Sequence, residues 1–143
     1  MEIFCLEEFK DEVERLKKNN SYADLEKEII EHFFDKPINE LKSGDLLNNS
    51  DDKPYIKKRL NGRGGFRVYF LLIIIKDCLY LMYVHPKSGK YGSDNITKEA
   101  RNGFLRKVID CIKSKPEALF EVKKDSTNTK LMFKPKDTKI LST

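Results

Sequence analysis

Apolar residues in the first third of the chain recur every three or four positions, which is the spacing of one face of an α-helix. A first helix is predicted on Leu6, Phe9, Val13 and Leu16. Its acidic start and the Lys17-Lys18 pair at its end match the helix dipole. A second helix, after a break at Asn19-Asn20, is predicted on Tyr22, Leu25, Ile29 and Phe33. A short strand over residues 2–6 precedes the two helices, which should form a helical hairpin.

Long apolar runs replace this spacing in the middle of the chain. Phe66 to Ile75 and Cys78 to Val84 are separated only by Lys76-Asp77, which predicts a β-hairpin. The stretch from Leu71 to Ile75 within the first run lacks polar alternation, so its strand should be covered on both faces. A short cationic strand over residues 55–60 leads into it through a glycine-rich turn, Gly62, Gly64 and Gly65.

The remaining segments complete an α+β order. Polar residues with Pro37, Gly44 and Pro54 predict a linker or mobile loop over residues 35–54. Part of it could dock on the core through Ile38, Leu41, Leu46 and Leu47. A third helix is predicted on Ile96, Ala100, Phe104, Val108 and Ile112. A second hairpin is expected from residues 119–123 and 130–134, before a basic tail. Two helices followed by a meander that buries one face beneath them indicate the α+β class.

Length and composition fit one soluble globular domain. The chain has 143 residues, of which 39% are hydrophobic and 36% are charged. No apolar run reaches the roughly 18 residues of a membrane span, and the acidic amino terminus shows no secretory signal. We therefore expect a cytoplasmic protein. Cys5, Cys78 and Cys111 are odd in number and far apart, which favours buried free thiols over disulfides or a zinc site.

Positive charge is concentrated in the later part of the chain. The first 50 residues carry 7 Lys and Arg against 13 Asp and Glu, and the remainder carries 21 against 10. Such asymmetry indicates a polyanion-binding face, although a lysine-rich surface of compositional origin is the alternative. The cations cluster beside turns, and interleaved aromatic residues suit stacking on unpaired bases. The candidate RNA-binding residues are Lys57, Lys58, Arg59 and Arg63.

Arg67 opens a strand that is otherwise wholly apolar. An arginine side chain can hold a phosphate through two parallel hydrogen bonds. A guanidinium at the rim of such a strand needs a partner, and a phosphate undergoing transfer is one. The alternative is an ion pair with an acidic residue of the first or second helix.

A loop after the second apolar run carries His85, Lys87, Lys90 and Tyr91. Cleavage of RNA by its own 2′-hydroxyl needs a base, cations that stabilise the phosphorane, and an acid for the leaving oxygen. Histidine titrates near neutrality and can serve as base or acid. A packing role for His85 is the alternative, and His32 is interpreted as structural. The chain has no metal-ligand spacing, so we expect neither metal nor cofactor.

These residues occur in an order that resembles the RelE/HigB toxins of bacterial toxin–antitoxin pairs. The resemblance covers residues 54–114 and runs from Lys-Arg-Leu through Gly-Arg-Gly-Gly-Phe-Arg-Val-Tyr-Phe to a Lys-Ser-Gly-Lys loop before a helix. It implies a small RelE-like α+β fold, a mostly antiparallel meander with two N-terminal helices and one later helix packed on it. Residues 1–125 would form a single toxin domain, and residues 126–143 a basic C-terminal extension.

The resemblance also implies an activity and partners. Such toxins enter the ribosomal A site and cut messenger RNA without a metal, and a cognate antitoxin masks their cations with an acidic or amphipathic segment. Arg67 matches the family's strand arginine. The implied catalytic set is Arg67, His85, Lys87, Lys90 and Tyr91. The reaction would be a transphosphorylation that leaves a 2′,3′-cyclic phosphate.

Three features depart from the family pattern. The 35–54 loop is long, residues 116–143 extend beyond a compact toxin, and no tyrosine lies near the end of the third helix. Two other functions remain open. A ParE-like relative would inhibit DNA gyrase by protein contact, and a non-catalytic RNA-binding protein would show salt-dependent affinity without cleavage.

Overall fold

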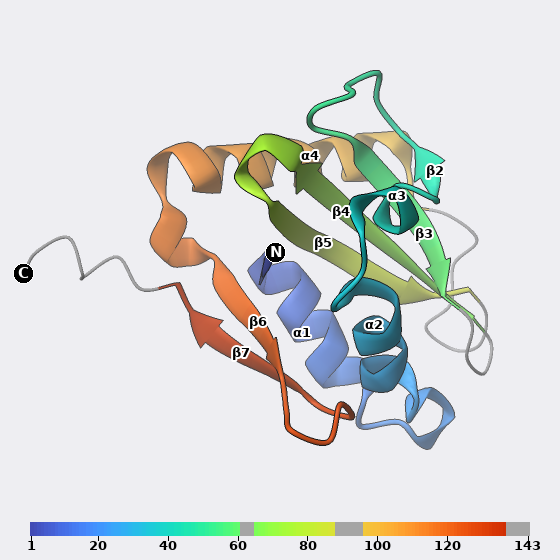
Figure 1. Ribbon diagram of the computed structural model, residues 1–143. Helices are drawn as coiled ribbons and strands as arrows, with labels where there is room; N and C mark the ends of the chain where they lie inside the picture. Colours follow the sequence, from blue (N-terminus) through green and yellow to red (C-terminus); the bar gives the residue numbers. More distant parts are fainter. Residues whose placement is uncertain (61–64, 88–95, 137–143) are drawn as a thin grey trace, which may run out of the picture.

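The computed structural model describes residues 1–60, 65–87 and 96–136. In these ranges the chain forms one mixed sheet of seven strands in the order β2-β3-β4-β5-β1-β6-β7 (Figure 1). The strands are β1 (Glu2–Cys5), β2 (Asp45–Leu46), β3 (Tyr55–Leu60), β4 (Phe66–Ile73), β5 (Cys78–Pro86), β6 (Phe120–Lys124) and β7 (Leu131–Pro135).

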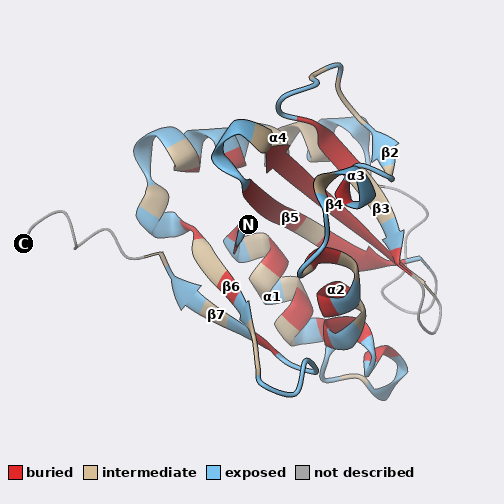
Figure 2. Ribbon diagram, viewed as in Figure 1, coloured by how far each residue is buried: buried red, intermediate tan, exposed pale blue. Residues whose placement is uncertain are grey.

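Helices cover both faces of this sheet (Figure 1). The α-helices are α1 (Glu7–Leu16), α2 (Leu25–Phe33), α3 (Ile38–Leu41) and α4 (Lys98–Ser114), and short 3₁₀ turns are η1 (Asn20–Tyr22), η2 (Ile74–Lys76) and η3 (Pro116–Ala118). Apolar side chains of α1 and α2 pack on one face, and those of α4 pack on the other. Strands β4 and β5 lie between the two layers and are buried along most of their length (Figure 2).

Several local predictions are confirmed. Helical spacing located α1, α2 and α4. In the stretch without alternation, Leu71 to Ile73 belong to the fully buried β4, but Ile75 lies in η2 and is exposed. The second hairpin forms as β6 and β7, which pair from Phe120↔Pro135 to Lys124↔Leu131. All three cysteines are free and buried. The described part of the chain contains no helix that is both long and apolar enough to cross a membrane.

The architecture differs from the expected meander in three respects. The sheet buries two faces, not one, because α4 returns to the side opposite α1 and α2. The sheet is mostly antiparallel within the described residues, as expected, but it is not a simple meander: β1 lies between β5 and β6 and runs parallel to β5, with Ile3 opposite Leu79. Residues 35–54 are not a simple linker. They include α3 and β2. Leu41 docks in the core as expected and is fully buried, whereas Leu46 is exposed.

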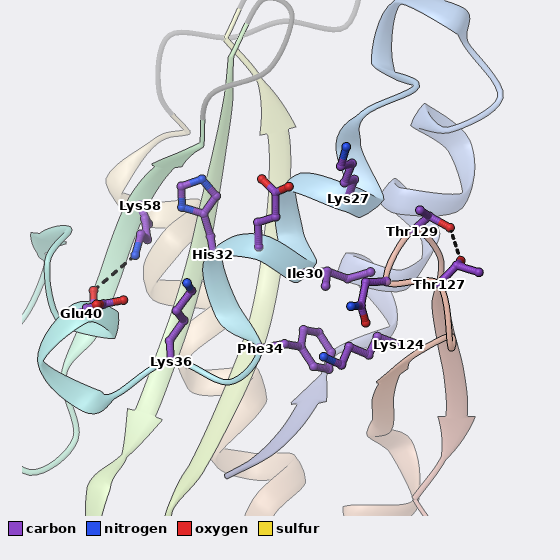
Figure 3. Close-up of a pocket in the computed structure, with 12 residues that line it drawn as sticks. Lys27, Ile30, His32, Phe34, Lys36, Glu40, Lys58, Lys124, Thr127 and Thr129 are labelled. Carbon is purple, nitrogen blue, oxygen red and sulfur yellow. Dashed lines mark hydrogen bonds between the residues drawn. The ribbon is translucent and has the colours of Figure 1, made fainter.

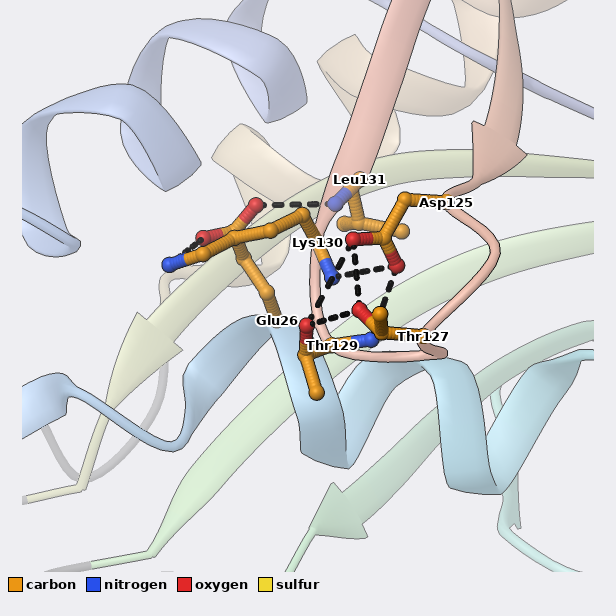
Figure 4. A network of polar contacts seen from close by, with 6 residues as sticks. All are labelled: Glu26, Asp125, Thr127, Thr129, Lys130 and Leu131. Carbon is orange, nitrogen blue, oxygen red and sulfur yellow. Dashed lines mark hydrogen bonds and ion pairs between the residues drawn. The ribbon is translucent and has the colours of Figure 1, made fainter.

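The β6–β7 hairpin is held on α2 by one buried carboxylate (Figure 4). The Leu131 backbone N–H donates to Glu26 Oε2 at 2.8 Å, and Lys130 Nζ lies 3.8 Å from Glu26 Oε1. Within the turn, Asp125 accepts hydrogen bonds from Thr127 and from the Thr129 backbone, and these lower the pKa of Asp125 to about 2. Residues 126–135 therefore contribute a strand to the same sheet, and residues 137–143 lie outside the described residues.

Candidate functional site

Three ionisable residues form a row across three neighbouring strands. Arg59 of β3 is the register partner of Arg67 of β4, and Arg67 is the register partner of His85 of β5. Neighbouring strands lie roughly 4.8 Å apart, so the row brings two guanidinium groups and an imidazole to one end of one sheet face. This is the face that α4 covers, since Tyr69, two residues after Arg67, packs in the α4 core.

A β-bulge determines that His85 belongs to this row. The β4–β5 register shifts between Tyr69, which pairs with Tyr83, and Phe70, which pairs with Leu81. Met82 is the extra residue. If β4 and β5 paired regularly, with Met82 in the ladder, Val84 would lie opposite Arg67 and His85 would turn to the other face, because side chains alternate along a strand. The position of His85 is a correction to the sequence analysis, since His85 lies within β5 and not in a loop.

His85 is buried and held in one orientation. Only 3% of its surface is exposed. Nδ1 lies 3.0 Å from the Pro86 carbonyl oxygen, which can only accept, so this hydrogen bond places the proton on Nδ1. Nε2 is then an acceptor, and the Tyr69 hydroxyl lies 3.4 Å from it. Burial lowers the pKa of His85, and the nearby positive charges of Arg67 and Lys57 lower it further. The imidazole is therefore neutral at pH 7, and the lone pair on Nε2 faces the Tyr69 hydroxyl.

Arg67 is also nearly buried, with 6% of its surface exposed. In residues 1–60, 65–87 and 96–136 it forms no salt bridge, and its buried Nε atom has no hydrogen-bond partner. The alternative pairing with an acid of α1 or α2 is not found there. Like charges directly opposite each other in a sheet are destabilising, so an anion beside Arg59 and Arg67 would relieve their repulsion and satisfy Nε.

Two residues that the sequence analysis did not identify adjoin this row. Tyr69 stacks on His85 with ring centroids 5.8 Å apart, and burial raises the pKa of its hydroxyl, which stays a donor at neutral pH. The positive charges of Arg67 and Arg101 oppose that rise. A sequence signal existed for Tyr69, because it lies two residues after Arg67 on one strand. No comparable signal existed for Arg101, which α4 brings to the site.

Other predicted cations divide between the two faces. Lys57 alternates onto the face of Arg59, and its Nζ lies 3.5 Å from Asp45 Oδ2. Lys58 points to the opposite face, where Nζ donates to the Glu40 carbonyl oxygen at 3.3 Å. Lys58 lines a separate hollow of about 760 Å³ beside α2, together with His32 and Lys36 (Figure 3). Lys58 is therefore not brought together with Arg67.

The last predicted residues lie near or beyond the described end of β5. Lys87 is exposed, and its backbone N–H donates to the Gly65 carbonyl oxygen at 3.1 Å, which ties it to the start of β4. Arg63, Lys90 and Tyr91 lie outside the described residues.

His32 lies on the α2 side of the sheet, away from the row. Its Nε2 is 3.7 Å from Glu28 Oε1. Burial lowers the pKa of His32, and the positive charge of Lys58 lowers it further. Within the described ranges, no three His, Cys, Asp or Glu side chains gather in a metal-binding arrangement.

The candidate site thus consists of the Arg59–Arg67–His85 row with Tyr69, Lys57 and Arg101 around it.

No family model and no curated protein matches this chain.

Proposed function

We propose that this protein is the toxin of a toxin–antitoxin pair and acts as a metal-independent, ribosome-dependent endoribonuclease. One observation carries the proposal: the row of Arg59, Arg67 and His85 on one sheet face, with an unpaired buried Nε on Arg67. Two arginines are suited to a phosphate, and a neutral imidazole beside them is suited to proton transfer. The resemblance to RelE/HigB toxins supplies messenger RNA in the ribosomal A site as the substrate.

In this reaction His85 Nε2 exchanges its contact with the Tyr69 hydroxyl for the RNA 2′-hydroxyl and takes the proton of that 2′-hydroxyl. The 2′ oxygen attacks the adjacent phosphorus, and Arg67 and Arg59 stabilise the negative charge of the phosphorane. The bond from phosphorus to the 5′ oxygen then breaks, the leaving oxygen takes a proton from water, and the upstream fragment keeps a 2′,3′-cyclic phosphate. Protonated His85 returns its proton to water. Lys87, which is exposed beside the site, is the described candidate for charge stabilisation at the leaving group.

The burial of this row favours a second candidate function. Arg67 and His85 expose only 6% and 3% of their surfaces, so a phosphate reaches them only if neighbouring groups move. A protein that binds RNA through its exposed cations and does not cleave it needs no such movement. Under this alternative, Arg67 and His85 position β4 and β5, and Arg59 and Lys87 contact the RNA backbone.

Induced expression of the chain without an antitoxin tests the proposal. We expect growth arrest and new, in-frame messenger RNA 5′ ends for the wild type. Arg67→Lys keeps the charge but loses the two-pronged contact with a phosphate, so cleavage should fall by about 100-fold. Arg106→Ala removes an exposed arginine of α4 and is the matched control that should cut normally.

Circular dichroism and thermal unfolding of purified Arg67→Lys separate loss of chemistry from loss of fold. Arrest with intact messages would contradict an endonuclease and direct attention to gyrase or another protein target. Salt-dependent RNA affinity with no cleavage and no arrest would establish the binding function instead.

A further inference from the structure

An apolar groove lies at the other end of the α4 face. It has a volume of about 460 Å³, and the apolar residues that line it are Leu71, Ile73, Ile75, Leu105, Ile109 and Ile112. These come from β4, η2 and α4. Ile73 is six residues beyond Arg67 on the same strand, which is roughly 20 Å at the rise of an extended chain. The groove is thus separate from the Arg59–Arg67–His85 row.

Two isoleucines of the groove are open to solvent. Ile75 is 85% exposed and Ile109 is 37% exposed. A single exposed apolar side chain is ordinary, but two that line one groove over buried Leu71 and Ile73 make a continuous apolar surface in contact with water. Such a surface is typical of a site that another chain covers.

The charged residues at this groove all carry one sign. Lys53, Lys76 and Lys113 line it and are exposed, and no acidic residue lines it. Among the described residues, none of these three lysines forms a salt bridge. Apolar contact in the centre and cations at the rim together favour an occupant with apolar side chains flanked by carboxylates.

We propose that this groove binds an apolar segment flanked by acidic residues in a partner protein. Charge argues against two other occupants. A symmetric contact between two copies of this face would set the same lysines against one another. The end of this chain is the other candidate, and its Lys136 and Lys139 would be repelled by the lysines of the groove. The proposal does not depend on the proposed nuclease function, because the groove lies at the opposite end of the sheet face.

Two synthetic peptides test this proposal on the full chain by nuclear magnetic resonance. Both carry the same cluster of leucines, flanked by glutamates in one peptide and by lysines in the other. The glutamate peptide should bind with a dissociation constant on the order of 100 µM or tighter. Its binding should change the chemical shifts of Ile73, Ile75 and Ile109. The lysine peptide should bind at least tenfold more weakly.

Variants of the groove test whether the peptides bind there and whether its lysines set the preference. Ile109→Glu should lower the affinity for the glutamate peptide at least tenfold. Met132→Glu, at a 50%-exposed position on β7, should leave that affinity unchanged. Lys76→Glu combined with Lys113→Glu should reverse the preference between the peptides. Equal binding of both peptides, shifts mapped to other residues, or unchanged affinity of Ile109→Glu would overturn the proposal. Self-association that Ile109→Glu abolishes would overturn it too, since the occupant would then be a second copy.

Discussion

Arg67 and His85 face each other across β4 and β5 because β5 holds one extra residue, Met82, between them and the hairpin turn. The bulge reverses the alternation of the rest of β5, so that Val84 enters the α1–α2 core and His85 joins the α4 face. In this sequence the bulge at Met82 thus sets the register that pairs a neutral imidazole with a guanidinium, on which the proposed chemistry depends.

The stability of the fold should decrease as the pH falls through the range in which His85 titrates. Its ordinary pKa is 6.5, and burial lowers the pKa in the folded protein. Below pH 6.5 the unfolded chain therefore binds a proton that the folded chain does not, and the free energy of unfolding falls. Above pH 6.5 this contribution is fully present. Urea unfolding at a series of pH values between about 5 and 8 measures it.

His85→Asn should flatten this pH dependence, since an amide does not titrate. The chain has 2 histidines, and burial also lowers the pKa of His32, so His32→Asn is the matched control. It should remove only the part due to His32. A His85→Asn profile as steep as that of the wild type would show that His85 charges as easily in the folded chain as in the unfolded one.

The hydrogen bonds around His85 predict its tautomer. Donation from Nδ1 to the Pro86 carbonyl oxygen leaves Nε2 as the acceptor for the Tyr69 hydroxyl. The ¹⁵N chemical shifts of the ring at pH 8 should identify a protonated Nδ1. Tyr69→Phe should lower the free energy of unfolding by about 0.5–1.5 kcal/mol and leave that tautomer unchanged. A protonated Nε2 in the wild type would contradict the proposed role as a base.

Local spacing was sufficient to predict most helices and strands, but not their arrangement. Phe9 and Val13 of α1 mark a buried face by position alone. By contrast, the four residues of β1 contain nothing that selects β5 and β6 as neighbours. That choice depends on how α1 and α2 return the chain to the sheet, which is a property of the whole fold.

In the candidate site, too, local patterns predict some features and the whole fold determines the others. Alternation along β3 predicts that Lys57 and Arg59 share a face and that Lys58 lies on the other, so the split of these cations was available from the sequence. The pairing of Arg67 with His85 was not, because counting outward from the hairpin turn gives the wrong partner unless the bulge is known. Arg101 adjoins the site only through the packing of α4.

Removing the buried carboxylate on α2 should detach the β6–β7 hairpin locally. Glu26→Ala leaves the Leu131 N–H without its acceptor, and a buried unpaired donor costs about 1–3 kcal/mol. Glu26→Gln keeps an oxygen in place and should cost less. Glu31→Ala, an exposed position on the same helix, should change stability by no more than about 0.5 kcal/mol. Hydrogen exchange at the Leu131 amide should accelerate in Glu26→Ala alone.

Two glycines should respond to alanine in opposite directions. A Cβ at Gly44 would lie 2.5 Å from the Lys57 carbonyl oxygen and 2.7 Å from Ile56 Cγ2. Strand β2 would have to move away from β3, which should cost about 1–3 kcal/mol and lengthen the Asp45–Lys57 contact. A Cβ at Gly103 meets nothing within 4 Å, and alanine is the better helix former, so Gly103→Ala should add about 0.5–1 kcal/mol. Urea unfolding of both variants under the same conditions gives the comparison. A neutral Gly44→Ala would mean that β2 is free to shift against β3 and does not fix the position of Lys57.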